Sequence, residues 1–126
     1  MNKKTLFLAA SLVMIIATLT ACSSGMIGRS HGTRSNIHNE NSRDIYSYDL
    51  PEGAKTLTLD VQIQADQGNF SWQVIDPDGV IANQGTLEAV NQTDQRIELT
   101  LIPGKWSLEM IMEQASGSYD IEWRSR

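Results

Sequence analysis

The sequence has few of the residues that support covalent or metal-dependent chemistry. It contains one cysteine, Cys22, so no disulfide can form within the chain. Its two histidines, His31 and His38, lie near the front, and residues 44–126 contain none. Residues 44–126 therefore lack the base that a serine or cysteine nucleophile needs, and they lack the usual ligands of zinc. These absences exclude Ser–His and Cys–His arrangements for that stretch and leave a zinc site without support.

Basic residues are also scarce. The chain has 10 Lys and Arg against 15 Asp and Glu, for a formal net charge of −5. All the acidic residues follow Cys22, so residues 22–126 hold eight basic residues and a net charge of −7. Such a chain has no electrostatic footprint for nucleic acid, and we expect no nucleic-acid partner. It is also repelled by an anionic bilayer, so a lipid rather than a protein face would have to hold it there.

Only one long apolar run is present, at the front of the chain. Lys3 and Lys4 precede residues 6–20, which read LFLAASLVMIIATLT. This is the layout of a secretory signal peptide. The run is shorter than the roughly 20 residues of a membrane-spanning helix, and polar SSG follows at residues 23–25. We therefore favour a cleaved signal peptide over a membrane span.

The apolar run ends in the residues Leu19, Thr20, Ala21 and Cys22. This LTAC sequence resembles the lipobox of bacterial lipoproteins, in which Leu19, Thr20 and Ala21 would be read by the signal peptidase. The resemblance implies removal of residues 1–21, a diacylglyceryl thioether on Cys22 and usually a further acyl group such as palmitate on the new terminus. Two or more acyl chains make a durable anchor. The implied location is the cell membrane after export, or the outer membrane in a Gram-negative envelope.

Residues 22–43 differ in composition from the rest of the mature chain. Ser, Asn, Gly, His and Arg dominate, and no periodic apolar face is present. This composition predicts a flexible tether that follows the lipidated cysteine. His31 and His38 fall within it, and we interpret them as solvated linker residues. The alternative is a metal or pH-sensing site, which would need a rigid scaffold and partner ligands.

From residue 44 onward, apolar and polar residues alternate. Alternation repeated this often is typical of half-buried antiparallel strands. It predicts an all-β fold for residues 44–126, a single antiparallel, jelly-roll-like β-sandwich of seven or eight strands. The apolar residues in phase are Leu57, Leu59, Val61 and Ile63, then Phe70, Trp72 and Val74, then Ile97, Leu99 and Leu101, then Trp106, Leu108, Met110 and Met112, and finally Tyr119, Ile121 and Trp123.

Turn residues interrupt the alternation. Asp76-Pro77-Asp78-Gly79 has proline and glycine in the positions that favour a type I turn, which predicts a hairpin. We also expect residues 80–82 and 86–90 to be short strands around Gly85. Further breaks are predicted at residues 51–53 and 66–69, and hairpins are predicted at residues 103–104 and 116–117.

The order of these features is similar to the bacterial pre-peptidase C-terminal type of β-sandwich. The similarity lies in the DPDG turn at residues 76–79, the proline–glycine turn before Trp106 and the Gly117-Ser118-Tyr119 start of the last strand. It covers most of residues 45–124 and implies a fold more than a function. Members of that family are generally accessory modules of secreted enzymes, whereas we expect no enzyme beside this domain.

Two sets of residues are candidate binding sites. Asp76 and Asp78 are weak candidates for calcium ligands, because that ion takes several oxygen ligands; the alternative is an aspartate-capped turn. Trp72, Trp106 and Trp123 are candidate sugar-stacking platforms, but they lie in phase with aliphatic neighbours, which favours the core. No residue is singled out as catalytic, and the acidic residues are interpreted as the solvated faces of strands.

The sequence thus indicates a non-enzymatic, membrane-anchored envelope lipoprotein without a cofactor. Its partner is expected to be an envelope protein or a wall component. One alternative is a carbohydrate- or calcium-binding accessory module of the pre-peptidase C-terminal type. A second alternative is a small hydrolase that uses a pair of carboxylates.

Overall fold

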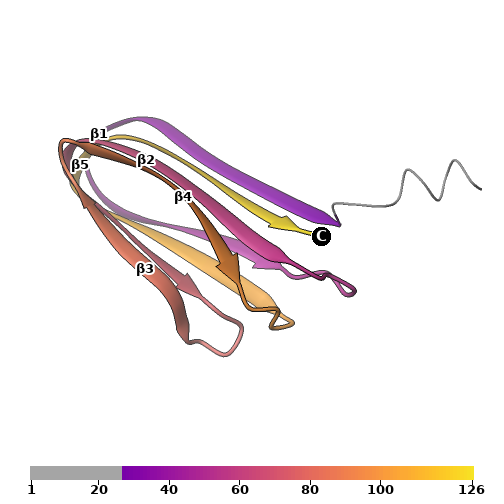
Figure 1. The fold of residues 1–126 in the computed structure, drawn as a ribbon. Helices are drawn as coiled ribbons and strands as arrows, with labels where there is room; N and C mark the ends of the chain where they lie inside the picture. Colours follow the sequence, from indigo (N-terminus) through magenta and orange to yellow (C-terminus); the bar gives the residue numbers. More distant parts are fainter. Residues whose placement is uncertain (1–26) are drawn as a thin grey trace, which may run out of the picture.

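The computed structural model describes residues 27–126, and every regular element in them is a β-strand (Figure 1). All the strands belong to one antiparallel sheet, which confirms the predicted all-β class. No helix in this part of the chain is long and apolar enough to cross a membrane. The strands are β1 (Gly28–Asp49), β2 (Leu57–Ile75), β3 (Ile81–Glu88), β4 (Asn91–Leu99) and β5 (Lys105–Ser125).

The sheet folds over on itself because its three longest strands bend (Figure 1). Layer A comprises residues 28–35 of β1, residues 117–125 of β5, residues 57–65 of β2, and β4. Layer B comprises residues 42–49 of β1, residues 105–112 of β5, residues 69–75 of β2, and β3. Counting β1, β2 and β5 once in each layer gives eight strand segments, in agreement with the predicted seven or eight.

The three bends coincide with register shifts and with left-handed backbone. Positive φ angles occur at Asn36 and Asn39 in β1, at Gly68 in β2, and at Gln114 and Gly117 in β5. Extra residues at these places break the ladder and turn the strand, as β-bulges do. A Cβ on Gly117 would collide with the backbone carbonyl of Gln64, so glycine is required there.

The predictions of a break at residues 66–69 and a hairpin at residues 116–117 were therefore wrong. Both segments are bends at which a strand passes from one layer to the other. The physical reason is that a bulge and a turn both use glycine with positive φ, and only the partner strand distinguishes them.

The predicted flexible tether was also wrong for residues 28–43. These residues form most of β1, which pairs with β5 in both layers. The strand carries no apolar alternation because it lies at the edge of both layers, where backbone hydrogen bonds hold it and much of one face meets solvent. The folded domain consequently begins at Gly28 and not near residue 44. Residues 19–22, and with them the predicted lipobox, lie outside the described residues.

The core between the layers is built from the predicted alternating residues. Trp72, Trp106 and Trp123 are at most 3% exposed, which confirms them as core residues. The indole of Trp72 packs over Gly85, where a Cβ would collide with it. Gly85 therefore lies inside β3 and does not separate two short strands as predicted. Leu101 was predicted to be buried but is 40% exposed, because β4 ends at Leu99 and residue 101 lies in the following loop.

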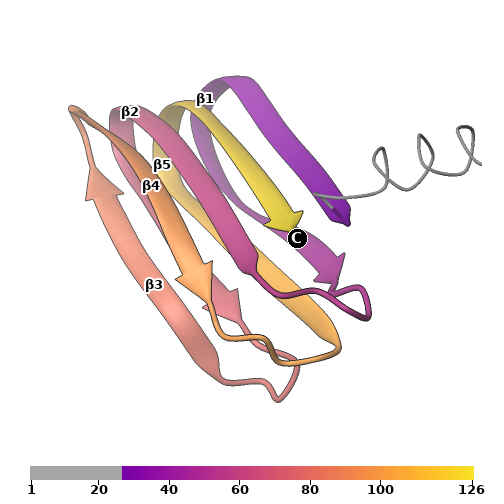
Figure 2. The same cartoon turned by 45° about the vertical axis from the view of Figure 1, so that its right-hand side comes forward.

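The end opposite the bends, here called the loop end, carries three connections and both ends of the described chain (Figure 2). The Asp76–Gly79 turn joins β2 to β3 as a hairpin, as predicted, with the amide of Gly79 donating to the carbonyl of Asp76 at 3.0 Å. Residues 50–56 and 100–104 instead connect opposite layers. The predicted hairpin at residues 103–104 was wrong, because β4 pairs with β2 and not with β5.

Candidate binding face

The outer face of layer A holds a shallow pocket of about 650 Å³, here called the polar trough. Its side chains point outward because they alternate with the buried residues of the same strands. Gln62 lies opposite Asp120 on one side and Asp94 on the other, and Gln64 lies opposite Ser118 and Gln92 in the same way. Four strands therefore contribute to one surface. The outward-facing polar residues of the trough include Thr33, Gln62, Gln64, Gln92, Asp94 and Asp120.

The side chains of the polar trough can contact a ligand through hydrogen bonds. Its glutamine amides supply both donors and acceptors, and its carboxylates supply acceptors. The side chain of Gln64 donates to Asp66 at 3.2 Å, which orients one of these amides. The described aromatic side chains lie in the core or at its margin, so the trough has no exposed ring for stacking. It suits a ligand rich in hydroxyl or amide groups more than an apolar one.

His31 lies on β1 at the margin of the trough, not in a solvated linker as predicted. Its Nε2 is 2.5 Å from Oδ1 of Asp120. Within residues 27–126 no serine hydroxyl bonds to this imidazole, so the pair lacks a nucleophile. His38 is exposed at the bend of β1. The sequence placed both histidines outside the domain because β1 was missed.

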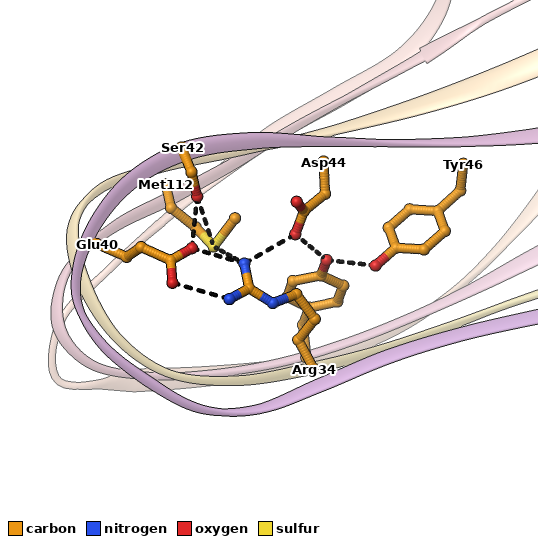
Figure 3. Close-up of polar contacts among 7 residues, drawn as sticks. Arg34, Glu40, Ser42, Asp44, Tyr46 and Met112 are labelled. Carbon is orange, nitrogen blue, oxygen red and sulfur yellow. Dashed lines mark hydrogen bonds and ion pairs between the residues drawn. The ribbon is translucent and has the colours of Figure 1, made fainter.

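A second group of polar residues, here called the Arg34 cluster, closes the edge of the sandwich along β1 (Figure 3). The Arg34 guanidinium donates to both carboxylate oxygens of Glu40, at 2.6 and 2.8 Å, and to Oδ2 of Asp44 at 3.1 Å. The hydroxyl of Ser42 donates to Glu40 at 2.6 Å. The chain reverses between Arg34 and Asp44, so this one side chain ties the two halves of β1 together across the bend.

Tyr119 extends the Arg34 cluster toward the core. Its hydroxyl donates to Oδ2 of Asp44 at 2.5 Å and lies 2.5 Å from the hydroxyl of Tyr46. Because the single proton of Tyr119 is used on Asp44, Tyr46 must donate to Tyr119. The two rings meet edge to face, with centroids 6.0 Å apart. Burial, followed by the bonds to Asp44 and Tyr46, raises the pKa of Tyr119 well above its ordinary value.

The same contacts decide what the carboxylates of the cluster can do. The hydrogen bond from Arg34 lowers the pKa of Glu40 to about 2, and the hydroxyl of Ser42 acts in the same direction. The bonds to Glu40 and Asp44 raise the pKa of Arg34 above its ordinary value. A carboxylate with a depressed pKa is ionised at neutral pH and is a poor general acid. The geometry therefore fits a structural clamp better than the acid of a glycoside hydrolase.

Asp76 and Asp78, the predicted candidates for calcium ligands, lie in the turn that joins β2 to β3. Oδ1 of Asp76 accepts hydrogen bonds from the amides of Asp78 and Val80, at 2.9 and 3.0 Å, which is the capped turn considered as the alternative to calcium binding. Within residues 27–126 no group of three His, Cys, Asp or Glu residues is arranged to hold a metal ion. The predicted lipidation residue Cys22 and the predicted recognition residues Leu19, Thr20 and Ala21 lie outside the described part of the chain.

The Arg34 cluster was not predicted, because residues 34–43 have the composition of a tether. A signal was nevertheless present: Glu40, Ser42, Asp44, Tyr46 and Tyr48 occupy every second position. Such spacing places them on one face of a strand. The trough was missed for another reason, since residues from β1, β2, β4 and β5 meet there only in the folded sheet.

Comparisons with known proteins reveal the fold alone. No family model matches the chain, and no curated protein matches it. The structure is similar to the pre-peptidase C-terminal domain of a collagenase from Bacillus anthracis, with 17% identity and a TM-score of 0.51 over 75% of this chain and 88% of that one. This likeness confirms, for the fold, the resemblance seen in the sequence. The chain has an antiparallel β-sandwich fold.

Two further solved structures are similar. A protein of Bacillus endospore appendages, which form disulfide-linked pili, shares 8% identity and a TM-score of 0.50 over 78% of this chain and 86% of that one. The module TmCBM61, solved with β-1,4-galactotriose, shares 13% identity and a TM-score of 0.47 over 67% of this chain and 61% of that one. At such identities these likenesses say nothing about the ligand of this chain.

Proposed function

We propose that this protein is a non-enzymatic binding module of the bacterial envelope, anchored through lipid on Cys22, which contacts a wall component or another envelope protein. The observation that carries the binding role is the polar trough, which four strands hold in fixed register on the outer face of layer A. Binding sites work best when rigid elements position their side chains. The LTAC sequence at residues 19–22 supports the anchor.

Site-specific photo-crosslinking in the native envelope tests the binding role. A photoreactive residue replaces Gln64, in the trough, in the whole chain expressed at its normal level. The matched control replaces Gln84, an exposed glutamine of β3 in layer B that lies opposite Gln73. Adducts that form from position 64 and not from position 84 would support the trough as the contact face. The same adducts from both positions, or none from position 64, would refute it.

A carbohydrate ligand is the second candidate, favoured by the side chains of the trough. Glutamine amides and aspartate carboxylates together satisfy sugar hydroxyls, which both donate and accept. Titration calorimetry with purified wall polysaccharide provides the test. We expect binding that weakens at least tenfold in Gln62→Ala, while Gln84→Ala leaves it unchanged. Equal effects of the two substitutions would contradict a carbohydrate site in the trough.

A further inference from the structure

Basic residues gather at one corner of the loop end. A pocket of about 500 Å³ there is lined by Lys55, Arg96, Arg124 and Arg126, together with exposed Leu101. These four are half of the eight basic residues that follow Cys22. We call this surface, with Leu101, the basic corner. An acidic chain has therefore placed half of its scarce positive charge in one corner.

The acidic residues near the basic corner do not cancel its charge. Asp60 accepts from both Arg96, at 2.9 Å, and Arg124, so one carboxylate serves two guanidinium groups. Glu122 lies 2.8 Å from Arg124 and also pairs with Arg29, and Glu98 lines the pocket. Within residues 27–126, Lys55 and Arg126 take part in no ion pair. Their charges are available to an anionic partner.

The basic corner is also where the chain enters the domain. The amide of Ile27 donates to the carbonyl of Ser125 at 2.9 Å, and the amide of Lys55 donates to the carbonyl of Arg126 at 2.5 Å. Cys22 lies five residues before Ile27. At about 3.3–3.6 Å per residue, an extended chain separates the two by at most about 18 Å. A lipid on Cys22 would thus keep the corner near the membrane surface.

Exposed apolar residues occupy the same end of the molecule. Of the six exposed large apolar residues in the described part of the chain, four lie there: Ile27, which is 47% exposed, and Leu101, Val80 and Ile81, which stand on or beside the loops. The opposite end presents exposed acids, among them Asp66, Glu88 and Glu113, whereas the loop end carries acids of its own, Glu52 and Asp78 among them, beside its basic residues. Basic and apolar side chains together favour the head-group region of an anionic bilayer, whereas acidic side chains are repelled from it.

We propose that the basic corner and its neighbouring loop residues dock on the phosphate-bearing head groups of the membrane that holds the anchor. The loop end then faces the bilayer, the bends point away, and the polar trough stays open to a ligand. This inference rests on the lipid anchor of the proposed function. It modifies the expectation that the whole domain is repelled by an anionic surface: net charge predicts repulsion, but the charge is distributed unevenly between the two ends.

Depth-dependent fluorescence quenching tests the orientation. The whole lipidated chain is placed in vesicles of phosphatidylglycerol and phosphatidylcholine, with a fluorophore on Leu101→Cys. Because the natural cysteine would be acylated, the label reacts at one position. The control label is on Val90→Cys, 81% exposed between β3 and β4 at the bend end. We expect lipid-borne quenchers to reduce emission at position 101 at least twofold more than at position 90; equal quenching would overturn the docking.

A charge swap tests whether the basic corner is responsible. Lys55→Glu should lower the quenching at position 101 at least twofold, as should vesicles of phosphatidylcholine alone. Arg43→Glu makes the same change of charge at an exposed site in layer B and should have little effect. Equal losses of quenching at position 101 in the two variants would indicate that membrane contact depends on net charge. That result would overturn the role of the basic corner.

The intact mass of the protein in the same sample shows whether a failure concerns the lipid anchor or only the docking. A chain without lipid refutes the anchor, and the docking with it. A lipidated chain whose label at position 101 remains in water overturns the docking alone.

Discussion

The hydroxyl of Tyr119 donates a 2.5 Å hydrogen bond to Oδ2 of Asp44, joining the core of layer A to the half of β1 that lies in layer B. The same carboxylate accepts from Arg34, which lies on the other half of β1. Asp44 is therefore the point at which the two layers and the bend are connected by side chains. This relationship makes the edge of the sandwich sensitive to single polar substitutions.

We expect Tyr119→Phe to destabilise the domain by about 1–3 kcal/mol, because it removes the donor to Asp44 and the acceptor for Tyr46 in a buried position. Tyr46→Phe removes one bond from a less buried ring and should cost only about 0.5–1.5 kcal/mol. Urea unfolding of both variants measures the difference. A Tyr46→Phe variant that is the less stable of the two would contradict this account.

The stability contributed by Glu40 should depend on pH. Its pKa is lowered from 4.5 to about 2 in the folded state, so its contribution is complete above about pH 4.5 and is lost as the pH falls toward 2. The gap in urea midpoint between the wild type and Glu40→Gln should therefore narrow over that range. Glu52→Gln, which makes the same change of charge at an exposed loop position, is the control and should shift the urea midpoint little. A pH-independent gap for Glu40→Gln would refute the prediction.

Gly117 should tolerate substitution far less well than Gly53. Both have positive φ: at Gly53, with φ of 80°, alanine costs roughly 1–2 kcal/mol, and the φ of 146° at Gly117 is still less accessible to a residue with a Cβ. Only at Gly117 would the new Cβ also collide with the carbonyl of Gln64, whereas nothing lies within 4 Å at Gly53. We expect Gly53→Ala to fold with modest loss and Gly117→Ala to lose several times more, or to fail to fold. Thermal melts followed by circular dichroism compare them, and similar melting temperatures would rule out the clash.

The domain boundary at Gly28 can be tested by truncation. Residues 27–126 retain β1, whereas residues 44–126 lack its layer A half, which includes Arg34, and its bend, which includes the buried Ile37. We expect the shorter chain to melt at least 10 °C lower or to lose its cooperative transition. Equal melting temperatures would restore the prediction that residues 28–43 are a tether.

Cys22→Ala should block lipidation and leave an uncleaved or soluble protein. The motive is the LTAC sequence at residues 19–22. Intact-mass measurement of the mature wild-type protein shows whether Cys22 is the amino terminus and carries diacylglycerol. A mass without diacylglycerol, or an amino terminus other than Cys22, would exclude the anchor.

Strand positions and the core were predictable from the sequence because alternation is a local property. Leu57 to Ile63 and Trp106 to Met112 place every second side chain on one face, whichever strand lies beside them. That pattern determined an all-β fold and the burial of Trp72, Trp106 and Trp123, and the turn residues at 76–79 determined a hairpin.

The bends, the order of β1 and the groups of surface residues depend on the tertiary structure. Gly68 and Gly117 become bends instead of turns because β2 and β5 pair with each other on both sides of them. β1 is ordered by backbone bonds to β5, which leave no mark in side-chain hydropathy. The Arg34 cluster, the polar trough and the basic corner bring together residues as far apart as Arg34 and Tyr119, or Lys55 and Arg126. Such groupings depend on long-range register, which no local sequence pattern specifies.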